Sequence, residues 1–99
     1  MNFRVVLYAG TWKRRPPTEA VLRQCLRWFF GTELGKVRFV ESDEDIAVEA
    51  NFSAFLEDET HGDIVCDELC VDLLRRMEPE FETMVEVEVL DNDWCVCGE

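Results

Sequence analysis

The sequence predicts an α+β fold of the ferredoxin-like kind, in which the order βαββαβ forms a four-stranded antiparallel sheet with two helices on one face. Side chains alternate with a period of two in four separate segments, as in strands. Two further segments carry apolar stripes at helical spacing, and turn-forming residues separate the segments. With 99 residues the chain has room for one domain, 1–99, in which 94–99 forms a tail or an extra strand.

The first strand and the first helix occupy the N-terminal third. Residues 3–9 alternate between two largely apolar sets, which is typical of a central strand, and Gly10 ends it. Thr18 can cap a helix by accepting a hydrogen bond from the first turn. An apolar stripe follows, and Gly31 is a natural C-terminal stop.

A hairpin is predicted in the middle of the chain. Residues 37–41 form a short strand, and the polar residues 42–45 form a turn. Residues 46–54 alternate apolar and polar side chains more regularly than any other segment, which indicates a half-buried strand. Because the two strands are separated only by this turn, we expect them to pair.

The last helix and the last strand follow. Asp63 can cap the helix, and Pro79 prevents its continuation. Residues 85–89 alternate valine with glutamate, as in a strand with one acidic face. The right-handed crossover rule then places the first and third strands in the middle of the sheet.

The charge is strongly negative and unevenly spread. The net charge is −12, with +6 on residues 1–38 and −18 on residues 39–99. Such an excess of carboxylates argues against unaided binding to DNA, RNA or an anionic membrane. It favours a basic partner, and we expect a basic nucleic-acid-binding protein or complex.

Acidic residues gather in three clusters, around the hairpin turn, around the start of the second helix, and in and before the last strand. Carboxylates spaced over a rigid surface can imitate a phosphate backbone, because lysine and arginine bind both groups. The alternative is an ordinary solvated surface. The candidate partner-binding residues are Glu41, Asp43, Glu44, Asp45, Glu57, Asp58, Glu59, Asp63, Asp67, Glu68, Glu86 and Glu88.

In its size, acidity and expected topology, the chain resembles small acidic viral inhibitors of host defence nucleases, notably anti-CRISPR and anti-restriction proteins. The resemblance rests on no motif. It implies a non-enzymatic inhibitor that occupies the nucleic-acid channel or recognition site of an effector complex and thereby excludes DNA. It would act in the host cytoplasm.

The open face of the predicted sheet argues against RNA binding. RNA-recognition domains share the βαββαβ order but place stacking aromatic residues on the two central strands. Here Tyr8 is alone, and the third strand offers Glu49 instead. We expect Arg4 to form a cross-strand ion pair with Glu86 or Glu88. An alternative function is an assembly module that dimerises through an edge strand or through the sheet face, resting on Val6 and Tyr8.

The cysteines suggest a second alternative. If the C-terminus folded back over the second helix, Cys66, Cys70, Cys95 and Cys97 could surround zinc in a small regulator. Cys66 and Cys70 lie on the apolar stripe, however, where cysteine packs as a small hydrophobe, so we expect no metal or cofactor. The odd number of cysteines favours a reducing cytoplasm over a disulfide framework.

Catalysis is not expected. His61, the single histidine, lies in an acidic loop, and no nucleophile stands at a spacing that would pair with it. No glycine-rich phosphate loop, targeting segment or membrane span is predicted either. Exposed tryptophans are typical of interfaces. For Trp28 and Trp94, a position at the edge of the core is slightly favoured over an interface position. For Trp12, neither position is favoured.

Overall fold

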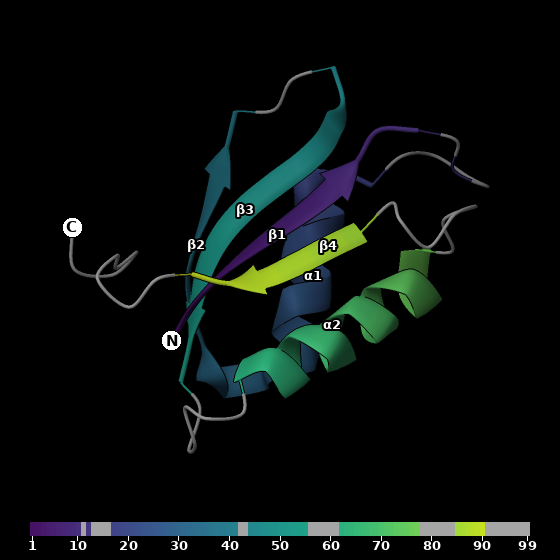
Figure 1. Ribbon diagram of the computed structural model, residues 1–99. Coiled ribbons are helices and arrows are strands. Elements are labelled where there is room, and N and C mark those ends of the chain that lie inside the picture. Colours follow the sequence, from purple (N-terminus) through teal and green to yellow (C-terminus); the bar gives the residue numbers. More distant parts are fainter. Residues whose placement is uncertain (11, 13–16, 42–43, 56–61, 78–84, 91–99) are drawn as a thin grey trace.

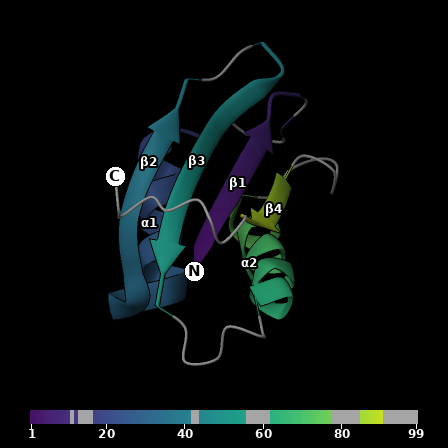
Figure 2. The ribbon, with the colours of Figure 1, turned by 60° about the vertical axis from the view of Figure 1, so that its left-hand side comes forward.

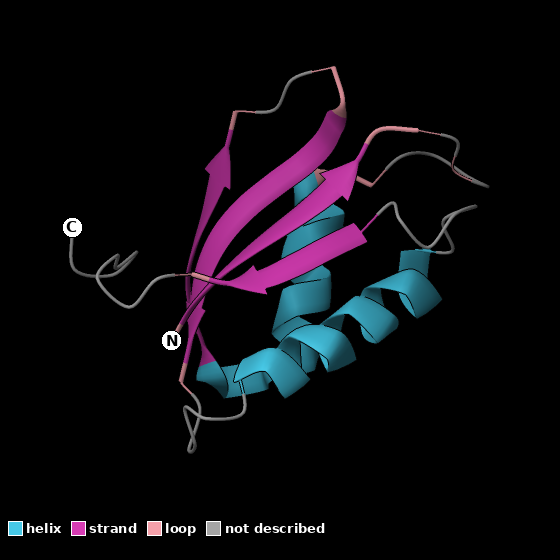
Figure 3. Ribbon diagram, in the orientation of Figure 1, coloured by secondary structure: helices cyan, strands magenta, loops and turns pink. Residues whose placement is uncertain are grey.

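A computed structural model describes residues 1–10, 12, 17–41, 44–55, 62–77 and 85–90. The elements are β1 (Asn2–Tyr8), α1 (Glu19–Phe30), a short 3₁₀ helix (Gly31–Glu33), β2 (Leu34–Val40), β3 (Ile46–Ala54), α2 (Gly62–Met77) and β4 (Val85–Val89). The sheet order is β2-β3-β1-β4, and every neighbouring pair is antiparallel. Both helices cover the same face of the sheet (Figure 1, Figure 3). The predicted ferredoxin-like architecture is confirmed.

The two central strands are β1 and β3, as the crossover rule predicted. In the register, Val5 lies opposite Ala50 on β3 and opposite Val87 on β4. Phe3, Val5 and Leu7 alternate toward the helices and are fully buried. In Figure 2, α1 lies behind β2 and β3 and α2 lies beside and below β4, so no helix covers the face of the sheet that is turned to the reader.

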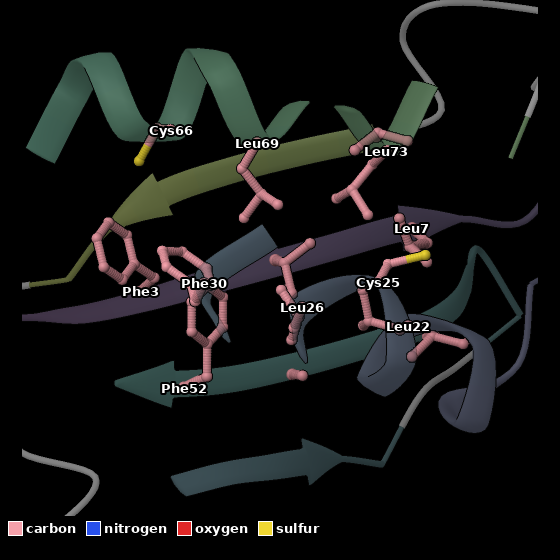
Figure 4. Close-up of a cluster of buried hydrophobic side chains, with 14 of the residues drawn as sticks. Phe3, Leu7, Leu22, Cys25, Leu26, Phe30, Phe52, Cys66, Leu69 and Leu73 are labelled. Carbon is pink, nitrogen blue, oxygen red and sulfur yellow. The ribbon is translucent and has the colours of Figure 1, made fainter. Parts of the chain in front are cut away.

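The core lies between the sheet and the helices. The ring of Phe3 stacks on Phe52 at 5.2 Å between centroids, and Phe30 from α1 lies 5.4 Å from Phe52. In Figure 4, Leu26 of α1 and Leu69 of α2 point into the same cluster. The predicted apolar stripes therefore pack on the sheet, except that Val21, predicted to be part of the α1 stripe, is exposed, and Phe30 is buried in addition.

Both ends of α1 behave as predicted. The Thr18 hydroxyl accepts a hydrogen bond from the Val21 amide at 3.3 Å. At the other end, Gly31 has a φ of +61°, and its N–H donates to the Arg27 carbonyl. This left-handed conformation favours glycine, which explains why the helix ends there.

The predicted boundaries of β2 and α2 are wrong. β2 begins at Leu34, three residues before the predicted start at 37, and ends at Val40 instead of 41. Its register with β3 shifts between Leu34 and Val37, and Gly35 lies against Ser53 too closely for any side chain. Because Gly35 and Lys36 interrupt the alternation of apolar residues, the start of this strand could not be recognised from the sequence. α2 begins at Gly62, so the predicted cap Asp63 lies in the first turn.

In the part of the chain that the structure describes, no helix is long and apolar enough to cross a membrane. The predicted tail or extra strand at 94–99 lies outside the described residues.

Candidate acidic binding surface

The open face of the sheet carries side chains from all four strands in register. One row across the sheet consists of Arg38, Asn51, Arg4 and Glu88, and the next consists of Val40, Glu49, Val6 and Glu86. The first row therefore begins with a cation on β2, and both rows end with a carboxylate on β4.

Arg4 holds two carboxylates at once. Its Nε donates to Glu49 at 2.9 Å, and its second guanidinium nitrogen donates to Glu88, also at 2.9 Å. The hydrogen bonds to Glu49 and then Glu88 raise the pKa of Arg4 further above its usual range. The predicted cross-strand ion pair is thus confirmed with Glu88. The bond to Glu49 went unpredicted, because it depends on which strands are neighbours.

Glu86 is fixed by a hydroxyl group instead of a cation. The Tyr8 hydroxyl donates to its carboxylate at 2.8 Å, and this bond raises the pKa of Tyr8. Glu86 is exposed to solvent. Its negative charge is therefore oriented by Tyr8 but not neutralised by it.

The neighbouring elements α2 and β4 each expose carboxylates. The Cys66 side chain is buried behind β4, and burial raises its pKa to about 11, with further contributions from Asp63, Asp67 and Glu88. α2 packs directly along β4 (Figure 1). We define the acidic edge as the four exposed residues Asp63, Asp67, Glu86 and Glu88.

The remaining candidates do not join this edge in the structure. Glu41, Glu44 and Asp45 are exposed around the turn between β2 and β3, which Figure 1 shows at one end of the sheet, away from α2. Glu68 is exposed on α2 beside a hollow between the helices. Four further candidates lie outside the described residues: Asp43, Glu57, Asp58 and Glu59.

The half of the predicted zinc site that the structure describes is packed as core. Cys66 is buried, and the Cys70 thiol donates to the Val85 carbonyl at 3.9 Å. Across the described ranges, no three histidine, cysteine or acidic side chains are grouped to hold a metal ion. Cys95 and Cys97 lie outside those ranges.

The tryptophans divide differently from the prediction. Trp12 is buried, and its indole N–H donates to the Tyr8 carbonyl at 3.1 Å. Trp28, predicted to cover a core edge, is 65% exposed on α1. The sequence could not predict this difference, because Trp28 lies beside the apolar residues Phe29 and Phe30, whereas Trp12 lies in a loop beside Lys13.

The acidic edge is an array of exposed carboxylates that suits the binding of cationic side chains. Alternate residues on β4 stand about 7 Å apart, and residues one turn apart on α2 rise by about 6 Å. Two rows of carboxylates are thus held on neighbouring elements. No family model, no curated protein and no solved structure matches this chain.

Proposed function

We propose that this protein is a non-enzymatic binding protein whose acidic edge occupies a basic, nucleic-acid-binding site of a partner protein and thereby inhibits it. The observation that carries the proposal is the packing of α2, which exposes Asp63 and Asp67, along β4, which exposes Glu86 and Glu88. These carboxylates come from two elements that are remote in the sequence, and the packing of α2 on β4 brings them together.

The electrostatics of the edge favour a basic partner. Like charges held close together repel one another and reduce the stability of the fold. Lysine and arginine side chains relieve that repulsion, and those that bind phosphate also bind carboxylate. Since Arg4 and Tyr8 already fix the carboxylates of β4, little side-chain entropy is lost on binding.

The expected partner follows from the same chemistry. A partner that binds DNA through phosphates offers a dense array of cations, because duplex DNA carries about one negative charge per 1.7 Å of axis. The resemblance to anti-CRISPR and anti-restriction proteins suggests a defence nuclease or its effector complex. The free thiols of Cys25, Cys66 and Cys70 are in keeping with a reducing cytoplasm.

Capture from a nuclease-treated lysate of the organism, or of its host, tests the proposal. One variant neutralises the acidic edge, with Asp63→Asn, Asp67→Asn, Glu86→Gln and Glu88→Gln. A matched control removes the same charge at exposed positions elsewhere, with Glu19→Gln, Glu33→Gln, Glu41→Gln and Glu44→Gln. Captured proteins are quantified by mass spectrometry at low and high salt.

We expect the wild type and the control to retain nucleic-acid-binding proteins at low salt and the edge variant to lose them. High salt should release them, because screening weakens contacts between exposed charges. Equal capture by the edge variant would overturn the proposal. Equal loss in the control would also overturn it, since the interaction would then depend on total charge alone.

A further inference from the structure

β2 is an edge strand, and no strand pairs with its outer side in the part of the chain that the structure describes. The sheet order is β2-β3-β1-β4, so β2 pairs with β3 alone. An edge strand leaves the N–H and C=O groups of every second residue free to pair with a further strand. The open face of the sheet offers less, because Val6 is only 1% exposed there and a sheet-face dimer resting on it lacks its apolar contact.

α1 places two arginines along this edge. Arg23 and Arg27 lie one helical turn apart, and the Arg23 guanidinium lies over the Phe39 ring of β2, at 5.0 Å from its centroid. Both arginines line a hollow of about 470 Å³ between α1 and the start of β2. Leu34 and Val37 form the apolar part of its lining. The hollow therefore combines an apolar wall with two cations.

The main chain is accessible in this hollow. Gly31 and Gly35 also line it, and neither carries a side chain that would keep a second chain away from the edge. A Cβ on Gly31 would meet nothing within 4 Å, so the space beside it is open. A peptide main chain can therefore approach the start of β2.

The charge along β2 is positive, although the whole protein is strongly acidic. Lys36 and Arg38 are exposed on the strand, and Arg23 and Arg27 flank it. Among the described residues, none of these four cations forms an ion pair with a carboxylate. Glu33, in the 3₁₀ helix, does not line the hollow. Because cations on an edge strand disfavour pairing with neutral or basic strands, this edge favours an acidic one.

We propose that β2 binds an acidic, extended peptide segment of a partner protein by strand addition, with carboxylates of the peptide on Arg23 and Arg27. In this mode of binding, main-chain hydrogen bonds supply affinity and alternate side chains supply specificity. Alternate residues of a strand stand about 7 Å apart, and residues one helical turn apart rise by about 6 Å. Two carboxylates on one side of the peptide therefore match the two arginines, which bind carboxylate through paired hydrogen bonds.

This site does not rest on the acidic edge, because β2 and β4 are the opposite edges of the sheet. The edge variant with Asp63, Asp67, Glu86 and Glu88 neutralised leaves β2 unchanged and lowers the negative charge. It should therefore bind an acidic peptide at least as tightly as the wild type, although it loses the basic partner. The two proposals can thus fail separately.

Fluorescence anisotropy with a labelled peptide that alternates threonine with glutamate tests the site. We expect the peptide to bind the wild type, and Arg23→Gln with Arg27→Gln to weaken binding about tenfold or more, because two charge-assisted contacts are lost. Arg75→Gln with Arg76→Gln is the matched control, since it removes the same charge from exposed positions on α2. Circular dichroism confirms that the variants are folded. A wild type that binds no peptide, or equal weakening in both variants, rules out this site.

Two further measurements test strand addition itself. A peptide with the same side chains and an N-methyl group on every amide keeps the charge but loses its hydrogen-bond donors, so it should not bind. Hydrogen exchange should slow along β2 when the unmodified peptide binds, and stay unchanged along β4. Equal binding of the methylated peptide, or of an oligothymidylate of the same charge, would contradict strand addition. An oligomer of the wild type alone that Arg23→Gln with Arg27→Gln dissociates would assign the edge to a second copy instead, against the proposal.

Discussion

Arg4 is the residue that joins three strands of the open face. It lies on β1 and bonds Glu49 of β3 and Glu88 of β4. The Glu49 side chain is only 13% exposed. Among the described residues, the Arg4 guanidinium is the one cation that compensates its charge. A partly buried carboxylate that loses its partner carries a desolvation cost.

Replacing Arg4 should therefore destabilise the fold. We expect Arg4→Gln to reduce the free energy of unfolding by about 1–3 kcal/mol, because Glu49 is left without its charge-assisted hydrogen bond. Arg38→Gln is the control, since Arg38 is exposed in the same row of the sheet and should cost less than about 0.5 kcal/mol. Urea unfolding measures both, and equal effects would show that Arg4 has no special role.

Cys66 should make stability fall at alkaline pH. Burial raises the pKa of its thiol from 9.0 to about 11 in the folded protein. Between these values the unfolded chain loses the proton and the folded chain keeps it, so rising pH favours unfolding. We expect the unfolding free energy of the wild type to fall more steeply from pH 9 to pH 11 than that of Cys66→Ala. Parallel slopes in urea unfolding would contradict this.

At the scale of elements, the sequence predicts what local chemistry determines. The ends of α1 follow from a hydroxyl that caps and a glycine that adopts a positive φ. The start of β2 could not be predicted, because it depends on how closely Gly35 approaches Ser53 on the neighbouring strand. Such an approach is a property of strand pairing and leaves no periodic pattern in the sequence.

Gly35→Ala and Gly31→Ala should both destabilise the fold, but for different reasons and by different amounts. A Cβ on Gly35 would collide with the Ser53 hydroxyl, so Gly35→Ala should cost about 1–3 kcal/mol. Gly31→Ala meets open space and should cost about 1 kcal/mol through its positive φ alone. Adding Ser53→Ala should recover part of the loss at position 35 and none at position 31. Denaturant unfolding of the two double-mutant cycles measures this, and equal recovery would refute the steric explanation.

At the scale of the whole molecule, the uneven charge of the sequence does not become two opposite poles. β1, from the basic third, lies between β3 and β4 from the acidic remainder, and Arg4 compensates charges on both neighbours. The acidic edge arises where α2 and β4 pack together without a basic element between them. The sequence identified these carboxylates, but their convergence depends on the sheet order. For the same reason the turn around Glu44 remains separate.

Added salt should stabilise the folded protein, because it screens the repulsion between its negative charges. With a net charge of −12 and four exposed carboxylates along one edge, repulsion within the folded state decreases as salt is added. We expect the melting temperature to rise with sodium chloride, and to rise less in the variant whose acidic edge is neutralised. Differential scanning calorimetry measures both. A melting temperature that falls with salt in the wild type would show that attractive ion pairs dominate instead.

Competition with DNA tests the proposed function most directly. The captured partner is immobilised with this protein bound, and a short duplex DNA is added at increasing concentration. If the acidic edge occupies the nucleic-acid-binding site, the DNA releases the protein, and the protein in turn prevents the partner from binding DNA. A partner that binds the DNA and this protein at the same time, with undiminished affinity for each, would contradict the proposal.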